Sequence, residues 1–154
     1  MILYRIGNCN YINDLTGTGS RLYGGRWNSI GKSMVYFASS RALAVLEVLV
    51  HLSPATLPNN FCIGEFNVPD NSIFEAGEEH LPADWQNPSA PHLLQEFGDL
   101  FLTKKNFLLM KVPSVIVPQE FNYLLNPLYP AASKIKTVKT NPFSFDNRLL
   151  LQMG

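Results

Sequence analysis

Two charged side chains near the start of the sequence could do chemistry together. Arg26 directly follows Gly24-Gly25, and Glu47 interrupts an otherwise apolar run over 42–50. Paired glycines let the backbone approach another group closely, and the next arginine can offer its planar guanidinium to a phosphate or carboxylate. A carboxylate in an apolar segment is costly unless it is paired, protonated or facing a cleft. The stretch 21–51 is therefore the first candidate for an active site that binds an anion.

A structural interpretation of the same pair stays open. The glycine–arginine pattern is weak by itself, because the stretch has neither the Walker spacing nor a GxGxxG motif. Arg26 and Glu47 could instead form a buried ion pair. Such a pair predicts that removing either partner destabilises the fold by roughly 3–5 kcal/mol, whereas a catalytic pair predicts folded but inactive variants.

A strand and a helix must position these groups. Residues 34–38 (MVYFA) read as a strand that carries Tyr36, and Ser39 and Ser40 offer N-caps for the following helix. That helix should run from Arg41 to about Leu52. Because it is apolar almost all round, we expect it to be buried.

The rest of the chain reads mostly as scaffold. Arg5 lies in a strand over 2–6, where it is either an exposed alternate residue or points into a pocket. Pro113-Ser114 breaks an apolar run, which is typical of a bulge that re-aims a side chain beside a site. A helix beginning at Pro91 has one apolar face and is interpreted as core packing.

Further strands are expected over 62–68, 107–112, 115–117, 135–138 and 143–151, and loops over 8–20 and 75–91. The pattern predicts a single compact α+β domain over 1–154, built of short, mostly antiparallel strands with a buried central helix.

Charge limits the function classes. The chain of 154 residues has 12 basic and 12 acidic side chains, which argues against nucleic-acid binding by bulk charge. Residues 61–100 hold eight acids and no Lys or Arg, while both ends are basic. Either a positive site assembled from the two ends receives an anion, or the acidic middle is simply a solvated loop.

Cysteine usage and hydropathy indicate the compartment. Cys9 and Cys62 are the two cysteines, which gives neither a disulfide framework nor a zinc pattern. The start, MILYRIGNCN, lacks the long apolar region of a signal peptide, and no run is long enough to span a membrane. We therefore expect a cytoplasmic protein with no metal and no membrane association.

Two motifs together resemble the RES domain family. They are GGRWNSxGxxxVYxASSxALAxLEVLVH and VPSVIVPQEFNYLLNP, and the resemblance covers essentially the whole chain. The arginine, glutamate and serine for which the family is named match Arg26, Glu47 and Ser114. The opening arginine matches Arg5, and the strand tyrosine matches Tyr36. The Asn-Pro turn matches Asn126-Pro127, whereas the family histidine of this turn is replaced by Tyr129, which puts any role for it in doubt.

The resemblance implies a bacterial toxin with an ADP-ribosyltransferase-like fold. Such toxins act on NAD+ as a substrate, with no further cofactor, and are neutralised by a Xre-type helix-turn-helix antitoxin in a hetero-oligomer. Arg26, Glu47, Tyr36 and Ser114 would be the catalytic residues. The residues implied to bind NAD+ are Arg5, Tyr23, Gly25, Trp27, Asn28, Ser39 and Asn126.

The residue types suit cleavage of the nicotinamide–ribose bond, which passes through an oxocarbenium-like sugar. Arg26 and Arg5 could clamp the pyrophosphate, and Tyr36 could stack on nicotinamide, with Tyr23 and Trp27 as alternatives. Glu47 could bind ribose hydroxyls and stabilise the developing positive charge. Ser114 and Asn126 would hydrogen-bond the substrate or orient the other groups.

Four functions remain open at this point. NAD+ could be degraded by hydrolysis or phosphorolysis, or its ADP-ribose could be transferred to a protein, because the same groups serve both reactions. A ribonuclease-type toxin is a more distant alternative. It is opposed by zero net charge and by the small number of histidines, since the central motif holds none before its last residue, His51. A binding module without catalysis is the fourth.

Overall fold

The protein, seen here in a computed structural model that describes residues 1–53, 55, 57–88 and 91–151, is built around one sheet of seven strands. The strands are β1 (Ile2–Asn8), β2 (Val35–Ala38), β3 (Phe61–Asn67), β4 (Ile73–Glu75), β5 (Leu109–Pro113), β6 (Phe121–Leu125) and β7 (Lys136–Phe143). The helices are α1 (Thr18–Tyr23), α2 (Arg41–Leu49), α3 (Pro91–Lys104) and α4 (Asn147–Leu151). Short 3₁₀ turns lie at Glu78–His80 and Pro130–Lys134.

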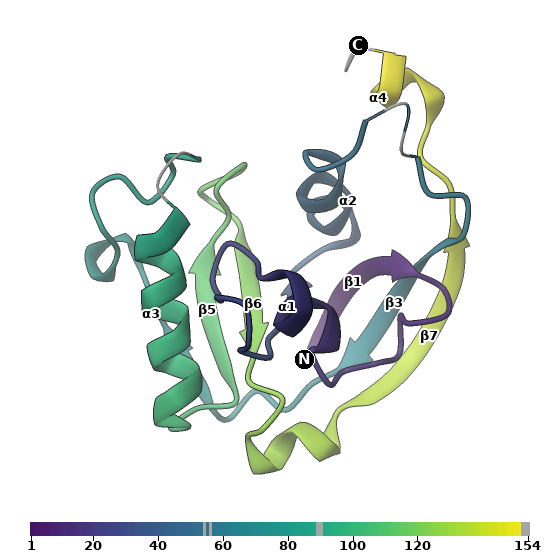
Figure 1. Ribbon diagram of the computed structural model, residues 1–154. Coiled ribbons are helices and arrows are strands. Elements are labelled where there is room, and N and C mark those ends of the chain that lie inside the picture. The colour runs from purple at the N-terminus through teal and green to yellow at the C-terminus, as the bar shows by residue number, and fades with distance from the viewer. Residues whose placement is uncertain (54, 56, 89–90, 152–154) are drawn as a thin grey trace.

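The sheet order is β4-β5-β6-β2-β1-β3-β7. Every neighbouring pair is antiparallel except β4 and β5, which are parallel. In Figure 1, α3 lies against the β5–β6 side, α1 lies in front of the middle, and β1, β3 and β7 form the other side. The predicted α+β class with a mostly antiparallel sheet is confirmed. Among the described residues, no helix is long and apolar enough to cross a bilayer.

Besides a smaller cluster that packs α2 onto β1 and β2, two apolar clusters fix the sheet between its helices. One gathers side chains of α3, β5 and β6 around Trp27, including Leu94, Phe101 and Met110. The other lies among the central strands, where Phe37 and Phe66 pack with ring centroids 5.3 Å apart. Burial of this much apolar surface is the main stabilising contribution to such a fold. It holds α3 and the central strands as a rigid support on which a site can be built.

Helix α2 begins where the sequence predicts. The hydroxyl of Ser40 accepts a hydrogen bond from the backbone N–H of Leu43 at 3.1 Å, so Ser40 is the N-cap. The helix ends at Leu49, earlier than expected, and only Leu43 and Ala44 in it are buried. The helix therefore buries one face, instead of the whole surface that its composition suggested. Val50, just after it, is 57% exposed.

Two helices were not predicted. Residues 18–20 belong to the predicted loop over 8–20, since Thr, Gly and Ser are poor helix formers, yet Thr18–Tyr23 forms α1. Its Ser20 hydroxyl is held by the backbone of Met34, with hydrogen bonds of 2.5 and 3.0 Å. The predicted strand over 143–151 is wrong apart from Phe143, which ends β7, because residues 144–146 are loop and α4 follows them. There the Asp146 carboxylate accepts from the backbone N–H of Arg148 at 2.9 Å, an N-cap interaction.

Two further differences concern strands. The predicted strand over 115–117 is absent, because these residues turn after Pro113. Residues 73–75, which no predicted strand covered and whose last residue begins the predicted loop over 75–91, add β4 to the edge of the sheet beside β5.

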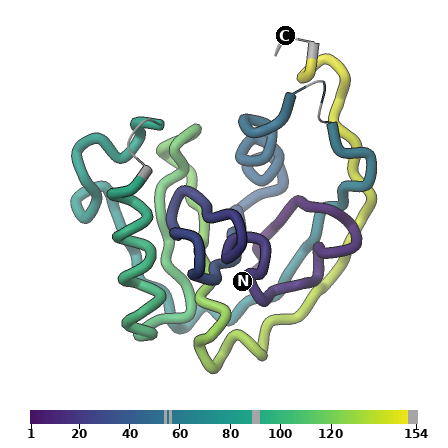
Figure 2. Tube along the Cα trace, in the orientation of Figure 1, coloured from purple at the N-terminus to yellow at the C-terminus, as the bar shows by residue number. Residues whose placement is uncertain are grey.

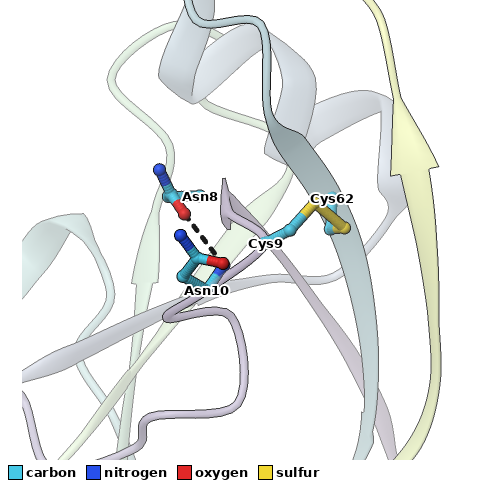
Figure 3. The surroundings of a disulfide bond; sticks show 4 residues. All are labelled: Asn8, Cys9, Asn10 and Cys62. Atoms are coloured by element: carbon cyan, nitrogen blue, oxygen red, sulfur yellow. Dashed lines mark hydrogen bonds between the residues drawn. A yellow bond between two sulfur atoms is a disulfide. The ribbon is translucent and has the colours of Figure 1, made fainter.

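The two cysteines are bonded to each other, contrary to expectation. Cys9 follows β1, Cys62 lies in the adjacent β3, and Figure 3 shows the disulfide between them. Strand pairing explains this, because Gly7 is opposite Cys62 and the Cys9 amide donates to the Asn60 carbonyl at 2.9 Å. The sequence alone did not indicate this bond, because 53 positions separate the two cysteines. The bond ties the loop after β1 to the sheet.

Candidate active site

A single cavity brings together most of the predicted site. Its volume is about 830 Å³, and its walls come from β1, α1, the glycine loop, β2, α2, β6 and the residues that follow β5. Figure 2 follows the chain through these segments, most of which are consecutive in the first 51 residues, and β6 lies beside β2 although it is far from it in sequence. The predicted site residues that line it are Arg5, Tyr23, Gly25, Arg26, Trp27, Tyr36 and Glu47. Ligand pockets usually measure about 300–1,000 Å³, so this one is large enough for a dinucleotide-sized molecule.

The side chain of Arg26 is unpaired among the residues that the structure describes. Among the described residues none forms a hydrogen bond or ion pair with its side chain, and its Nη1 atom is buried. An unpaired, buried cationic nitrogen is costly, and such groups in native structures usually await a ligand, water or ion. The guanidinium is therefore prepared to receive an anion that enters the cavity. No ion pair joins Arg26 to Glu47, which removes the structural interpretation of the pair as a buried salt bridge.

The glycines before Arg26 serve the close approach that the sequence suggests. Gly24 has φ of 73°, the left-handed region, and its amide closes α1 on the Ser20 carbonyl at 2.8 Å. A Cβ on Gly25 would lie 2.6 Å from the hydroxyl oxygen of Tyr36. The group approached by the loop is thus a tyrosine of the protein itself.

Tyr36 holds the loop through its hydroxyl. It donates to Asn28 Oδ1 at 2.5 Å and accepts from the Trp27 amide at 3.1 Å. Burial raises the pKa of Tyr36 well above its usual range, and nearby Asp99 raises it further, while the Trp27 amide and the Arg26 charge act in the opposite direction. The phenol stays neutral at physiological pH and acts as a fixed donor. Its hydroxyl is committed to the loop, and stacking of its ring on nicotinamide stays a prediction.

Glu47 is held by one carboxylate oxygen. Ser114 Oγ and Asn122 Nδ2 both donate to Glu47 Oε1, each at 2.6 Å. The same Ser114 oxygen accepts from the amides of Ile116 and Val117, each at 3.1 Å. In the described part of the chain nothing donates to Oε2. The arrangement orients the carboxylate and leaves its second oxygen free for a ligand in the cavity.

Ser114 and Asn122 differ in how they meet the cavity. Ser114 is fully buried and is absent from the cavity wall, so it acts on Glu47 and not on a ligand. Ser114 directly follows the end of β5 at Pro113, and the pairing of β5 with β6 runs in continuous register up to that proline. Asn122 lines the cavity and was missed. A signal was available, since a polar residue in a central strand, two positions before the buried Leu124, points to the same face.

Arg5 lines the cavity but has partners of its own. Its Nη1 donates to the carbonyls of Ile12 at 3.0 Å and Asp14 at 2.8 Å. Burial lowers the pKa of the Arg5 guanidinium, and the charge of Asp14 partly offsets this. Arg5 therefore fixes the loop after β1, and its expected clamp on a pyrophosphate would need the remaining guanidinium nitrogens.

Four predicted NAD-binding residues do not offer the contact expected of them. The described structure gives each another position or task. Asn28 is fully buried, and its amide donates to the Ser20 and Lys32 carbonyls, each at 2.9 Å. Asn126 is 1% exposed and lies outside the cavity wall, where its amide donates to the Leu102 carbonyl at 3.2 Å.

The other two are Trp27 and Ser39. Trp27 is 3% exposed, and its ring packs edge-on against Phe97, with centroids 6.4 Å apart. Ser39 is exposed and does not line the cavity. Tyr23, by contrast, is 82% exposed at the cavity rim, where its ring is free to contact a ligand.

The charge of the cavity comes from one part of the chain only. Its charged lining residues, Arg5, Asp14, Arg26 and Glu47, all belong to 1–60. Of the two interpretations of the charge pattern, the positive site assembled from both ends is wrong for this cavity, because no Lys or Arg of 101–151 reaches its wall. Within the described ranges, no three His, Cys, Asp or Glu side chains gather as metal ligands.

Comparison with known proteins places this arrangement in a family. The model of the RES domain matches residues 2–146. Toxin Res of Photorhabdus laumondii is 41% identical over 152 residues, which cover 97% of each chain. The Prs ADP-ribosylating toxin of a Sphingobium species is 41% identical over 141 residues, which cover 90% of this chain and 88% of that protein. Toxin Res of Yersinia enterocolitica is 36% identical, with 97% of this chain and 99% of that protein covered.

A solved structure agrees with the fold. A chain in the crystal structure of the M. tuberculosis MbcT–MbcA toxin–antitoxin complex superposes with a TM-score of 0.76, over 99% of this chain and 87% of that one. Its sequence identity is 15%, so this likeness supports the fold alone. The family match and the curated relatives, each spanning most of the sequence, show that this chain belongs to the RES domain family.

Proposed function

We propose that this chain is the toxin of a toxin–antitoxin pair and consumes NAD+ by cleaving its nicotinamide–ribose bond. The observation that carries the proposal is the composition of the cavity. A buried guanidinium nitrogen without a partner and a carboxylate with one free oxygen face the same space. NAD+ offers the matching groups, an anionic pyrophosphate and a ribose that becomes cationic as nicotinamide departs.

The arginine supplies binding. A guanidinium can hold a phosphate through two parallel hydrogen bonds, and each is stronger than a bond between neutral groups. Arg26 has all of its donors available among the described residues, whereas Arg5 uses Nη1 on the loop after β1. Arg26 is therefore the main pyrophosphate clamp in this proposal, and Arg5 is secondary.

The glutamate supplies stabilisation of the reacting sugar. As the bond breaks, its electron pair leaves with neutral nicotinamide, and positive charge moves to the anomeric carbon. Glu47 Oε2 would bind the ribose hydroxyls and offset this charge. Because Ser114 and Asn122 already fix Oε1, the carboxylate needs little reorganisation during the reaction. The reaction needs no bound cofactor in this proposal, since NAD+ is the substrate.

A second reactant must form a bond to the anomeric carbon after nicotinamide leaves. Water attacking the anomeric carbon gives ADP-ribose and a proton, and phosphate attacking it gives the phosphorylated ADP-ribose. Transfer to a protein side chain is the second candidate, and the observation that favours it is a relative at 41% identity named an ADP-ribosylating toxin. No comparable observation favours a ribonuclease or an inert binding module.

The partner and compartment follow from the same proposal. A structural neighbour is a toxin–antitoxin complex, which supports an antitoxin for this chain. We propose a Xre-type, helix-turn-helix antitoxin in a hetero-oligomer, with no direct nucleic-acid contact by this chain. We propose a cytoplasmic location, where disulfides rarely persist. Cys9 and Cys62 would then be reduced for much of the time.

Product analysis tests the proposal. Partner-free protein is incubated with NAD+, with and without phosphate, and nicotinamide and the ribose products are separated by chromatography. Nicotinamide release is expected, and the ribose product identifies water or phosphate as the acceptor. In parallel, labelled NAD+ is added to a cell lysate, where a discrete labelled protein band would favour transfer. Folded protein that releases no nicotinamide and labels no protein would overturn the proposal, and RNA cleavage without NAD+ loss would support the ribonuclease.

A further inference from the structure

Three residues on one face of α3 contact the loop that carries Arg26. Gln95, Gly98 and Asp99 follow the i, i+3, i+4 spacing that places side chains together on a helix. The sequence suggested only core packing for this helix. In the structure, these three residues contact the loop 25–29 from behind and do not themselves line the cavity.

The contacts lie on both sides of Arg26 in the chain. Gln95 Nε2 donates to the Gly25 carbonyl at 2.9 Å, one residue before the arginine. The Ser29 amide donates to Asp99 Oδ1 at 3.0 Å, and the Ser29 hydroxyl donates to Asp99 Oδ2. A loop fixed at both ends in this way has little freedom to move the residue between them.

Gly98 brings the loop backbone directly onto the helix. It is buried, and a Cβ at this position would overlap the carbonyl oxygen of Trp27. The overlap is with backbone, which cannot rotate away as a flexible side chain could. Glycine is therefore required at position 98 for the loop backbone to lie as close to α3 as it does.

We propose that Gln95, Gly98 and Asp99 are positioning residues that set where the Arg26 guanidinium stands in the cavity. The inference rests on the proposed function, in which Arg26 binds the pyrophosphate of NAD+. Arg26 itself has no partner among the described residues, so its place depends on the backbone of its loop. Releasing the loop should weaken substrate binding without touching Glu47.

Kinetics separate positioning from mere stability. A variant that only lowers the folded fraction reduces the apparent kcat and leaves KM unchanged, whereas a misplaced clamp raises KM. We expect Gln95→Ala and Asp99→Ala each to raise KM for NAD+ about tenfold, the scale of one lost hydrogen bond. Asp99→Asn should recover most of the loss, because it keeps the acceptor for the Ser29 amide. Glu96→Ala, which removes an exposed carboxylate from the same helix, is the matched control and should leave KM unchanged.

The effect must pass through Arg26. In an Arg26→Ala background, Asp99→Ala should raise KM no further, because the clamp that it positions is gone. Gly98→Ala should raise KM most, and Gly7→Ala is its control, since a Cβ there meets only Ile12 Cδ1 at 3.8 Å. If Gly98→Ala fails to fold, the Gln95 and Asp99 variants still decide the question.

A second measurement distinguishes failure of the inference from failure of the proposed function. Hydrogen exchange at the Ser29 amide, followed without substrate, should accelerate in Asp99→Ala and stay slow in Glu96→Ala. Active wild-type protein with an unchanged KM in Gln95→Ala and Asp99→Ala would overturn the inference. Wild-type protein that does not cleave NAD+, but shows the predicted exchange, would overturn the function and keep the role of α3 in placing the loop.

Discussion

The cavity has two walls that hold their charged groups in opposite ways. The arginine wall, residues 24–29 packed against α3, is fixed through its backbone, and no described residue holds the Arg26 side chain. The glutamate wall, α2 with Ser114 and Asn122, is fixed through the functional side chain itself, at Glu47 Oε1.

The difference indicates separate tasks. A free guanidinium can adapt to an anion and supply binding, which acts in the ground state and the transition state alike. A carboxylate held in place costs little reorganisation and can act where charge develops, so its contribution belongs to the transition state. The predictions below test this division, in order of expected effect on nicotinamide release.

Glu47→Gln should have the largest effect. Glutamine keeps an Oε1 acceptor for Ser114 and Asn122, so the fold should persist, with the free energy of unfolding changed by less than about 1 kcal/mol. The charge that we propose to stabilise the sugar is lost, and kcat should fall by about 10²–10³-fold. Steady-state kinetics and urea unfolding measure the two quantities. A kcat close to that of the wild type would remove Glu47 from the mechanism.

Arg26→Ala should act mainly on KM. Loss of charge-assisted hydrogen bonds predicts a rise of about 10- to 100-fold, with a smaller change in kcat. Because Arg26 has no ion-pair partner among the described residues, stability should stay within about 1 kcal/mol of the wild type. Unfolding by urea that shows a loss of roughly 3–5 kcal/mol would instead reveal a buried ion pair.

Ser114→Ala should loosen the glutamate wall and reduce kcat about tenfold, with little change in KM. It also removes the acceptor for two backbone amides, so the free energy of unfolding should fall by about 1–3 kcal/mol. Asn122→Ala removes the other donor to Glu47 and has no such backbone role. Equal stability losses in the two variants would argue against the distinct role of Ser114.

Tyr36→Phe tests the arginine wall from the side of β2. It removes hydrogen bonds to Asn28 and the Trp27 amide, which should cost about 1–3 kcal/mol and raise KM several-fold. The pKa of Tyr36 is raised on folding, so its contribution is complete below the unfolded pKa near 10 and declines as pH rises further. The stability difference between wild type and variant should shrink above that pH. A constant difference up to strongly alkaline pH would contradict the buried phenol.

The disulfide should matter least for activity, because it lies outside both walls. Cys62→Ser should lower the free energy of unfolding by about 2–4 kcal/mol, since it releases a constraint on the unfolded chain. We expect kcat and KM to stay within about twofold at 25 °C. Thiol titration of unfolded wild-type protein checks the bond itself, and two reactive thiols without reductant would show that it does not form.

Local signals in the sequence were sufficient for part of this account. The Ser40 cap and the Pro91 start of α3 follow from residue preferences that act over a few positions. The pairing of a glycine loop with Glu47 was visible because both lie in one short stretch. Tertiary contacts explain the rest. Ser20 anchors α1 to Met34, and the register of β1 and β3 joins cysteines that are far apart in the chain.

Local sequence signals also explain only part of the candidate site. Arg26, Glu47 and Tyr36 line the cavity as predicted, but Asn28 and Asn126 carry backbone hydrogen bonds that residue type alone does not reveal. The contacts of α3 with the loop span 70 positions and leave no local pattern. Long-range hydrogen bonds thus decide which polar residues remain available to a ligand.

The most direct test is nicotinamide release by partner-free protein over a wide range of NAD+ concentration. Wild type, Arg26→Ala and Glu47→Gln are compared at equal folded fractions. We predict that high NAD+ brings Arg26→Ala close to the wild-type rate, whereas Glu47→Gln stays about 10²–10³-fold slower at every concentration. Folded wild-type protein that releases no nicotinamide, or two variants that respond to NAD+ in the same way, would contradict a cavity with one binding wall and one reacting wall.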